Sequence, residues 1–519
     1  MTGSPSGGEA PAARTTGPKT SPVDWPTRDL VTIRAETTPE RTALVDAETG
    51  DTWTYRELDA SVDQAVRDIG VPAGGRLGVL CDTRVEVAML LFAAMRWGAT
   101  LVPLNVRNTA DELAKQAARA DLDMLACEAE TREMAETVAP AGCPVVDVAA
   151  MGTPATADGA ESPQGRRPVS PAELTPDTDL LLLFTSGTTG RPKGVRLTVA
   201  NLLASATASA FRLGVERGDR WLVCLPTYHM GGLAPFVRSA LYGTATVVQR
   251  EFDARETPAV MDRFDVTGVS LVPTILRRLL EAGWTAPTSL RFVLLGGAAA
   301  GHDLLEAALA SGVPVFPTYG MTEAASQIAT ATPEQVADSP GTVGQPLVNT
   351  CVRVLSETGE PCDTGDPGEL VVSGPTVTPG YLDDANTGAA FSDRGFHTGD
   401  VGYRDDDGLL WVTGRVDDRI VTGGENVDPS VVASTVRAHP DVSEAAVVGL
   451  PDEEWGERVA VLVVAASEEL SAAALQEFCR DRLADFELPK TIAFAPELPR
   501  TVSGTVDREA VRARLRKER

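Results

Sequence analysis

A stretch of ten residues rich in glycine and hydroxyl side chains, residues 185–194, constrains this chain more than any other feature. It reads Thr-Ser-Gly-Thr-Thr-Gly-Arg-Pro-Lys-Gly and follows an apolar run, residues 180–184, that predicts a buried strand. Glycine lets several backbone N–H groups point at one anion, and the hydroxyl groups and Lys193 add donors for phosphate oxygens. Because polar surface turns seldom combine so many such features, we interpret the stretch as a phosphate-binding loop. Its candidate ligands are Thr185, Ser186, Gly187, Thr188, Thr189, Gly190 and Lys193.

Strand and helix patterns alternate along most of the chain. An apolar strand at 75–81 precedes helical spacing at 85–97 and another strand at 99–104, an order that is typical of parallel sheets. Short alternating strands and turns follow residue 341. A chain of 519 residues is too long for one compact core. We therefore predict an α/β protein: a large N-terminal domain of parallel-type α/β sheets plus a β-rich subdomain, with a small α+β C-terminal domain.

The expected domain boundaries follow from composition and from the change of pattern. Residues 1–25 begin with a stretch rich in Gly, Ser, Thr and Pro, and we expect them to form a disordered tail rather than a signal peptide. The N-terminal domain is expected at 26–416 and a mobile C-terminal domain at 417–519.

The chain is strongly acidic, with a formal net charge of −27. This charge repels nucleic acid and anionic membrane surfaces, so neither is an expected partner. It also fits a cytoplasm of very high salt, as in a haloarchaeal cell, with an ordinary acidic protein as the alternative. Seven scattered cysteines without a C-x-x-C pair indicate reduced thiols in a cytoplasmic protein. Nothing in the sequence decides between a monomer and a homo-oligomer.

A second polar motif, residues 319–323, lies at the end of a predicted strand, where ligands bind in open α/β sheets. It reads Tyr-Gly-Met-Thr-Glu. Thr322 can donate to a phosphate, and Glu323 can hold Mg²⁺, which prefers carboxylate and phosphate oxygens. A helix start capped by Thr322 is the structural alternative. His229 also draws notice, because the chain has only four histidines, although a lone loop histidine is usually structural.

These motifs, in this order, resemble those of the acyl-adenylate-forming superfamily of AMP-binding enzymes, which includes acyl-CoA synthetases, firefly luciferase and peptide-synthetase adenylation domains. The resemblance extends from about residue 28 to the end. It implies ATP, Mg²⁺ and coenzyme A as cosubstrates, and it implies catalytic roles for Lys193, Thr322, Glu323 and His229. The further ATP-binding residues that it implies are Gly296, Gly297 and Ala298 in a turn against the adenine, Tyr319 stacked on the adenine, Gly320, and Asp400 and Arg415 at the ribose. It also implies a hinge at Asp417 and a CoA-tunnel loop at Gly423 and Gly424.

The acid that is activated is inferred from a narrower resemblance, to the 2-succinylbenzoate–CoA ligases of menaquinone synthesis. It rests on residues 225–233, 294–299 and 318–328. A diacid needs a cation for the carboxylate that does not react, and Arg238 is the candidate, with a surface arginine as the alternative. The acyl pocket implied in this way contains His229, Arg238, Ser326 and Gln327.

One residue departs from the family pattern. Thr505 stands where the superfamily has a C-terminal catalytic lysine, whose charge stabilises the adenylation transition state. Lys490 and Arg500 are the candidate substitutes. Two alternatives therefore stay open: a CoA ligase for another aryl or medium-chain fatty acid, and a nucleotide-binding protein with impaired adenylation.

Overall fold

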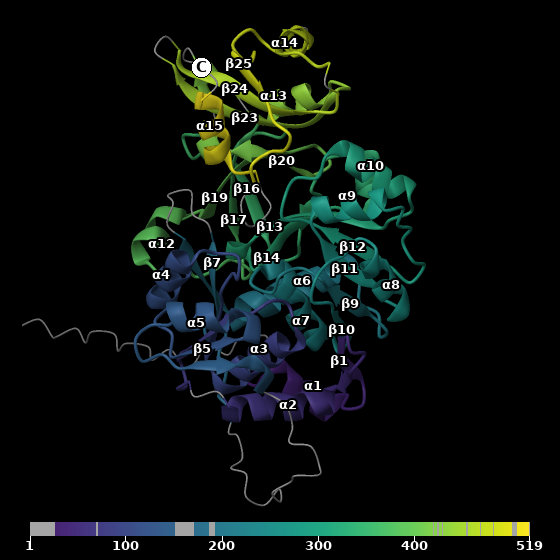
Figure 1. Cartoon of the computed structure of the whole chain (residues 1–519), viewed down its shortest axis with the longest axis vertical. Coiled ribbons are helices and arrows are strands. Elements are labelled where there is room, and N and C mark those ends of the chain that lie inside the picture. The colour runs from purple at the N-terminus through teal and green to yellow at the C-terminus, as the bar shows by residue number, and fades with distance from the viewer. Residues whose placement is uncertain are drawn as a thin grey trace, which may run out of the picture.

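The structure is a computed structural model that describes residues 26–519 except 69–70, 151–170, 186–191, 419, 423–424, 428, 453–454, 468, 481, 501–505 and 518–519. Figure 1 shows two large sheets with their helices in the lower part of the molecule and a smaller sheet with its helices at the top. The predicted tail, residues 1–25, lies outside the described residues.

The largest sheet has nine strands, and its six central strands run parallel, with antiparallel strands at both edges. Its strands, in spatial order, are β15 (Gln345–Pro346), β14 (Ser326–Thr330), β13 (Val315–Met321), β12 (Phe292–Leu295), β11 (Gly268–Leu271), β9 (Arg220–Val223), β10 (Ala245–Val248), β1 (Thr42–Asp46) and β2 (Thr52–Thr54).

The second sheet has six strands and the same design, because five run parallel and β8 joins one edge in an antiparallel hairpin with β7. Its strands, in spatial order, are β6 (Val145–Asp147), β5 (Met124–Cys127), β3 (Arg76–Leu80), β4 (Thr100–Pro103), β7 (Asp179–Thr185) and β8 (Lys193–Thr198).

Helices fill the space between these two sheets and cover their outer faces (Figure 1). A single core cluster includes Leu77 of β3 and Val223 of β9 together with apolar side chains of α2, α3, α6 and α7. Separate clusters cover the outer faces of the nine-stranded and six-stranded sheets. The helices are α1 (Leu30–Thr37), α2 (Tyr55–Asp68), α3 (Val85–Trp97), α4 (Ala110–Ala120), α5 (Arg132–Val138), α6 (Val199–Leu213), α7 (Met230–Tyr242), α8 (Glu256–Arg263), α9 (Pro273–Glu281), α10 (His302–Ala310), α11 (Pro333–Asp338) and α12 (Asp384–Ala390).

Two smaller sheets follow. The β-rich part, which the short strands and turns after residue 341 predicted, is an antiparallel sheet. It consists of β16 (Cys351–Leu355), β17 (Gly368–Ser373), β18 (Phe391–Ser392), β19 (Gly395–Arg404) and β20 (Leu410–Arg415). The last sheet packs against its own helices around two apolar clusters. It consists of β21 (Ile420–Thr422), β22 (Glu425–Val427), β23 (Val442–Asp452), β24 (Gly456–Ala465) and β25 (Thr491–Phe494), with α13 (Pro429–Arg437), α14 (Ala472–Arg480) and α15 (Arg508–Lys517).

The sequence patterns predicted the parallel strands well, and the helix predicted at 85–97 has the predicted bounds. Strand β8 was missed. Its sequence, Lys-Gly-Val-Arg-Leu-Thr, begins with the two residues that had been assigned to the phosphate loop. The loop therefore joins the two strands of a hairpin.

A buried arginine holds the first three helices together. Arg96, in the last turn of α3, is 2% exposed and bonds to Asp29 at 3.0 Å, Asp59 at 2.5 Å and Asp63 at 2.6 Å. Asp29 also caps α1, since its side chain accepts a hydrogen bond from the backbone N–H of Thr32. One guanidinium thus joins α3 to α1 and to α2.

Replacing Arg96 is expected to destabilise this part of the protein strongly. The change Arg96→Met leaves carboxylates without their cation, and breaking a buried ion pair on one side costs about 3–5 kcal/mol. The matched control is Arg56→Met, because Arg56 pairs with Glu40 on the surface and such pairs contribute about 0–1 kcal/mol. Urea unfolding in the same buffer compares the two variants, and equal midpoints would contradict the role given to Arg96.

Candidate active site

The hairpin of β7 and β8 carries the phosphate-loop residues at its end. Thr185 is paired with Lys193 where the two strands end, and the Thr185 hydroxyl donates to the Lys193 carbonyl at 3.5 Å. The Lys193 ammonium lies 5.2 Å from the centre of the Tyr381 ring. The other predicted members of the loop lie outside the described residues: Ser186, Gly187, Thr188, Thr189 and Gly190.

The hairpin of β13 and β14 carries the second motif in the same way. A single 3₁₀ turn, Thr322–Ala324, joins the two strands, and Thr322 does not cap it. Only glycine fits at Gly320, because a Cβ there would lie 1.7 Å from the carbonyl oxygen of Ser326. Ala325 and Ser326 have φ angles of 51° and 118°, which side-chain-bearing residues rarely adopt. Such strain is typical of functional turns.

A short segment, residues 378–382, joins the two hairpins. The carbonyl of Gly194 in β8 accepts from the backbone N–H of Leu382 at 2.7 Å. The carbonyl of Glu323 accepts from the backbone N–H of Thr378 at 2.7 Å, and the Tyr381 hydroxyl donates to Oε1 of Glu323 at 2.9 Å. The Tyr381 side chain therefore contacts both Lys193 and Glu323.

Sequence reasoning missed Tyr381, which lies 58 positions after Glu323 in the chain. No local pattern connects the two, because the contact depends on how the segment crosses both hairpins. Burial raises the pKa of Glu323, while the Tyr381 hydrogen bond and the charge of Lys193 act in the opposite direction. Glu323 can hold Mg²⁺ when it is ionised. No group of three metal-binding side chains occurs among the described residues, so an Mg²⁺ ion here needs further oxygens, such as those of a nucleotide.

The predicted ribose-binding residues lie together. Asp400, in β19, accepts from the Tyr319 hydroxyl at 2.7 Å and from Arg415 of β20 at 2.7 Å. Each bond uses a different carboxylate oxygen, so each oxygen keeps a lone pair for a ribose hydroxyl. Burial raises the pKa of Asp400, and Arg415 opposes this rise.

Two polar side chains behind Asp400 were also missed. Glu369 of β17 accepts from the backbone N–H of Gly399 at 3.2 Å, and its other oxygen lies 2.8 Å from Nδ1 of His397. His397 in turn contacts the Ser392 hydroxyl at 2.8 Å. This chain of contacts holds the part of β19 that leads to Asp400.

The predicted adenine turn follows β12. Gly297 has a φ of 80°, the left-handed conformation that favours glycine, and a Cβ on Gly296 would lie 2.7 Å from the Thr318 side chain. Ala298 continues this turn. Because β12 is paired with β13, the turn lies beside the strand that leads to Tyr319.

Three of the four predicted acyl-pocket residues, Arg238, Ser326 and Gln327, form one cluster. Arg238 lies in α7, is 2% exposed, and its Nη2 donates to Gln327 Oε1 at 2.9 Å and to the Ser326 hydroxyl at 3.2 Å. Its guanidinium lies 5.1 Å from the centre of the Trp221 ring, and its Nε has no partner among the described residues. The surface-arginine alternative is therefore wrong.

The charge of Arg238 is unusual for a buried group. No ion pair to a carboxylate is found for it in the described part of the chain. Burial lowers its pKa to about 10, so it is still charged near neutral pH. A buried charge without a counter-ion is costly, and an anionic ligand would offset that cost.

His229 precedes the first residue of the same helix. It contacts the Tyr228 ring edge-on, and burial lowers its pKa, so its imidazole is neutral near neutral pH. Arg238 is nine positions further along the chain, about 13 Å along the helix axis at 1.5 Å per residue. The two side chains can therefore contact different parts of one bound molecule.

The C-terminal candidates are described only in part. The backbone of Asp417 lies in a 3₁₀ turn, Val416–Asp418, that follows β20, while Gly423, Gly424 and Thr505 lie outside the described residues. The Lys490 ammonium lies 3.3 Å from the centre of the Trp455 ring, and Arg500 pairs with Glu444 at 2.8 Å. Both candidate substitutes for the missing lysine thus have partners within the last sheet.

The fold and the two hairpins are those of a class of nucleotide-binding enzymes. The chain belongs to the AMP-binding enzyme family, whose model matches residues 31–382, and the model for the C-terminal domain of these enzymes matches residues 432–505.

Within this family the chain is similar to 2-succinylbenzoate–CoA ligases. It is 36% identical over 481 residues to the enzyme of that name from Bacillus licheniformis. The aligned region covers 92% of this chain and 97% of that relative. It is also similar to the structure of o-succinylbenzoate CoA synthetase from Bacillus subtilis in complex with the acyl-adenylate intermediate OSB-AMP. The TM-score is 0.85 at 32% identity, covering 93% of this chain and 98% of that one. The complex of that synthetase with ATP and magnesium ion gives a TM-score of 0.83 at 32% identity, covering 94% and 99%.

Removing the Tyr381 hydroxyl tests its role in holding Glu323. We expect Tyr381→Phe to lower kcat/KM for Mg·ATP roughly 10- to 100-fold, because a hydrogen bond to a charged group is lost. The matched control is Tyr403→Phe, since Tyr403 stacks on Trp411 in the β-rich sheet. Similar effects of both changes on kcat/KM would show that Tyr381 has no special role.

The raised pKa of Glu323 predicts a pH dependence that responds to magnesium. A carboxyl whose pKa is raised above 4.5 stays protonated to a higher pH than an ordinary glutamate does. As the pH falls, kcat/KM for Mg·ATP should therefore begin to decline at a higher pH than an ordinary glutamate would cause. Mg²⁺ competes with the proton for Glu323, and more Mg²⁺ should therefore move the acid limb to lower pH. Steady-state profiles of kcat/KM against pH at two Mg²⁺ concentrations measure this shift. If the acid-side decline stays at the same pH at both concentrations, Glu323 is not its cause. The acid-side decline of kcat/KM should remain in the variant Asp400→Asn, in which Glu323 is unchanged.

Proposed function

We propose that this protein is an AMP-forming acid–thiol ligase that converts 2-succinylbenzoate, ATP and CoA into 2-succinylbenzoyl-CoA, AMP and diphosphate, as a step of menaquinone biosynthesis. The observation that carries the choice of acid is the Arg238 cluster. A buried guanidinium without a carboxylate partner, flanked by Ser326 and Gln327, suits the second carboxylate of a diacid.

In the first half-reaction a substrate carboxylate oxygen bonds to the α-phosphorus of Mg·ATP, and the bond from that phosphorus to the bridging oxygen breaks to release diphosphate. We assign the phosphate contacts to the glycine loop, to Lys193 and to Thr322, and the magnesium contact to Glu323. We assign ribose binding to Asp400 and Arg415, and adenine binding to Tyr319 and the turn at residues 296–298.

In the second half-reaction the thiolate sulfur of CoA bonds to the acyl carbon, and the bond from that carbon to the AMP oxygen breaks. We propose that residues 26–416 and 417–519 are separate domains, and that the smaller one rotates about Asp417 between the two steps. The loop with Gly423 and Gly424 would then reach the pantetheine thiol.

We further propose that the protein works in a cytoplasm of high salt, which would screen its net charge of −27. The same charge opposes binding to nucleic acid and to anionic membranes. No helix in the described part of the chain is long and apolar enough to cross a membrane.

The first test is diphosphate release from Mg·ATP at high KCl with 2-succinylbenzoate, benzoate or octanoate, with and without CoA. We expect fast release only with 2-succinylbenzoate, and thioester only when CoA is present. Faster release with benzoate or octanoate would favour a ligase for another acid. Thioester formation from synthetic 2-succinylbenzoyl-AMP and CoA, without release from any acid, would favour impaired adenylation.

A variant pair tests the assigned role of Arg238. We expect Arg238→Met to lower kcat/KM for 2-succinylbenzoate roughly 10²- to 10³-fold, since a desolvated charge pair is lost. The control is Arg404→Met, because Arg404 is a partly buried arginine outside the proposed site and bonds to the Val352 carbonyl in the β-rich sheet. Equal rates in the Arg238 variant and the parent would remove the reason for choosing a diacid.

A further inference from the structure

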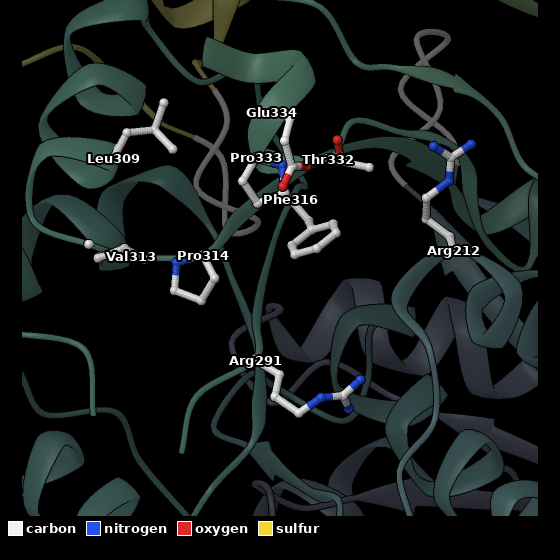
Figure 2. Close-up of a pocket in the computed structure, with 10 residues that line it drawn as sticks. Arg212, Arg291, Leu309, Val313, Pro314, Phe316, Thr332, Pro333 and Glu334 are labelled. Atoms are coloured by element: carbon white, nitrogen blue, oxygen red, sulfur yellow. The ribbon is translucent and has the colours of Figure 1, made fainter. Parts of the chain in front are cut away.

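A pocket of about 560 Å³ opens far from the candidate active site (Figure 2). Arg291 immediately precedes β12, and Gly312 to Pro314 precede β13, so the pocket lies where these parallel strands begin. The adenine turn and the Thr322 turn follow the other ends of the same strands. Seven residues of β13 at about 3.3 Å each separate the two sites by roughly 20 Å.

The pocket has apolar walls and two guanidinium groups. Figure 2 shows Arg212 and Arg291 on different sides of it, with the Phe316 ring directed into the space between. Glu334 lies at one side. The apolar wall residues are Leu309, Val313, Pro314, Phe316 and Pro333.

The two arginines differ in their partners. Arg291 is neutralised, because its Nη1 lies 2.7 Å from both carboxylate oxygens of Asp219 and its Nε lies 3.0 Å from Glu216. Arg212 donates one long hydrogen bond of 3.4 Å to the Gln345 carbonyl, and no carboxylate of the described residues pairs with it. Burial lowers its pKa, and no neighbouring carboxylate opposes this shift.

The chain has 73 acidic residues and 46 lysines and arginines, so acidic side chains outnumber basic ones. Arg212 is nevertheless without a carboxylate partner among the described residues, and its partly exposed guanidinium can therefore bind an anion from solution.

We propose that this pocket binds a small organic monoanion, a carboxylate with an apolar or aromatic body. The carboxylate bonds to Arg212, and the body packs against Phe316 and Pro314. The volume lies within the range of small-molecule sites, about 300–1,000 Å³. The Arg212 guanidinium can pair with one negative charge on the ligand, and the nearby Glu334 carboxylate disfavours a second negative charge on it. This binding does not depend on the ligase reaction.

Calorimetric titration with 2-naphthoate at the lowest KCl that keeps the protein folded tests the proposal. We expect Arg212→Gln to weaken binding at least about tenfold, while Arg238→Met binds as the parent does. The uncharged analogue 2-naphthamide should bind the parent at least about tenfold more weakly. The control for the loss of one charge is Arg255→Gln, since Arg255 is exposed and remote from the pocket.

Two further readouts separate a ligand site from a structural arginine. Arg212→Gln should unfold at the same urea concentration as the parent or a higher one, because it removes a charge without a carboxylate partner, and its rate of diphosphate release should be unchanged. Equal affinity of the parent and Arg212→Gln for 2-naphthoate would overturn the proposal. Loss of binding in Arg238→Met alone would assign the binding to the acyl pocket, which also overturns it.

Discussion

The candidate active site depends on the hydrogen bonds by which residues 378–382 join two hairpins from different sheets. The hairpin of β7 and β8 belongs to the six-stranded sheet, and that of β13 and β14 belongs to the nine-stranded sheet. The bonds of Leu382 to Gly194 and of Thr378 to Glu323 fix the spacing between the hairpins. Lys193 consequently lies over the Tyr381 ring, and Glu323 accepts from the Tyr381 hydroxyl, so one side chain contacts a candidate phosphate ligand and the candidate magnesium ligand.

The two large sheets share a design that explains why the site lies where it does. In each, parallel strands end at one edge in an antiparallel hairpin, so a short turn projects beyond the sheet. The α2, α3, α6 and α7 core between the sheets holds these hairpins in register. The helix α7 belongs to that core and carries Arg238 within it, so a charged group is buried next to the turn that holds Ser326.

Much of this organisation could be predicted from local sequence. The apolar runs of the parallel strands, the helix at 85–97 and the β-rich character after residue 341 follow from periodicity alone. The Arg238, Ser326 and Gln327 set was expected from resemblance, and these side chains do lie together. Strand β8 was missed because glycine and lysine conceal its alternation. Tyr381 and Glu369 were missed because each acts on a residue far away in the chain.

The sequence by itself determined the class of fold and the chemical types at the site, since strand periodicity and the order of glycine, hydroxyl and acidic residues are local properties. Only the tertiary structure decided which charges are paired. Residue type alone does not distinguish Arg96, Arg238 and Arg212. In the fold, however, Arg96 contacts three carboxylates, Arg238 contacts a hydroxyl and an amide, and Arg212 makes one long hydrogen bond to a carbonyl. The reason is physical: the free energy of a charged group depends on burial and on partners that the fold brings from distant parts of the chain.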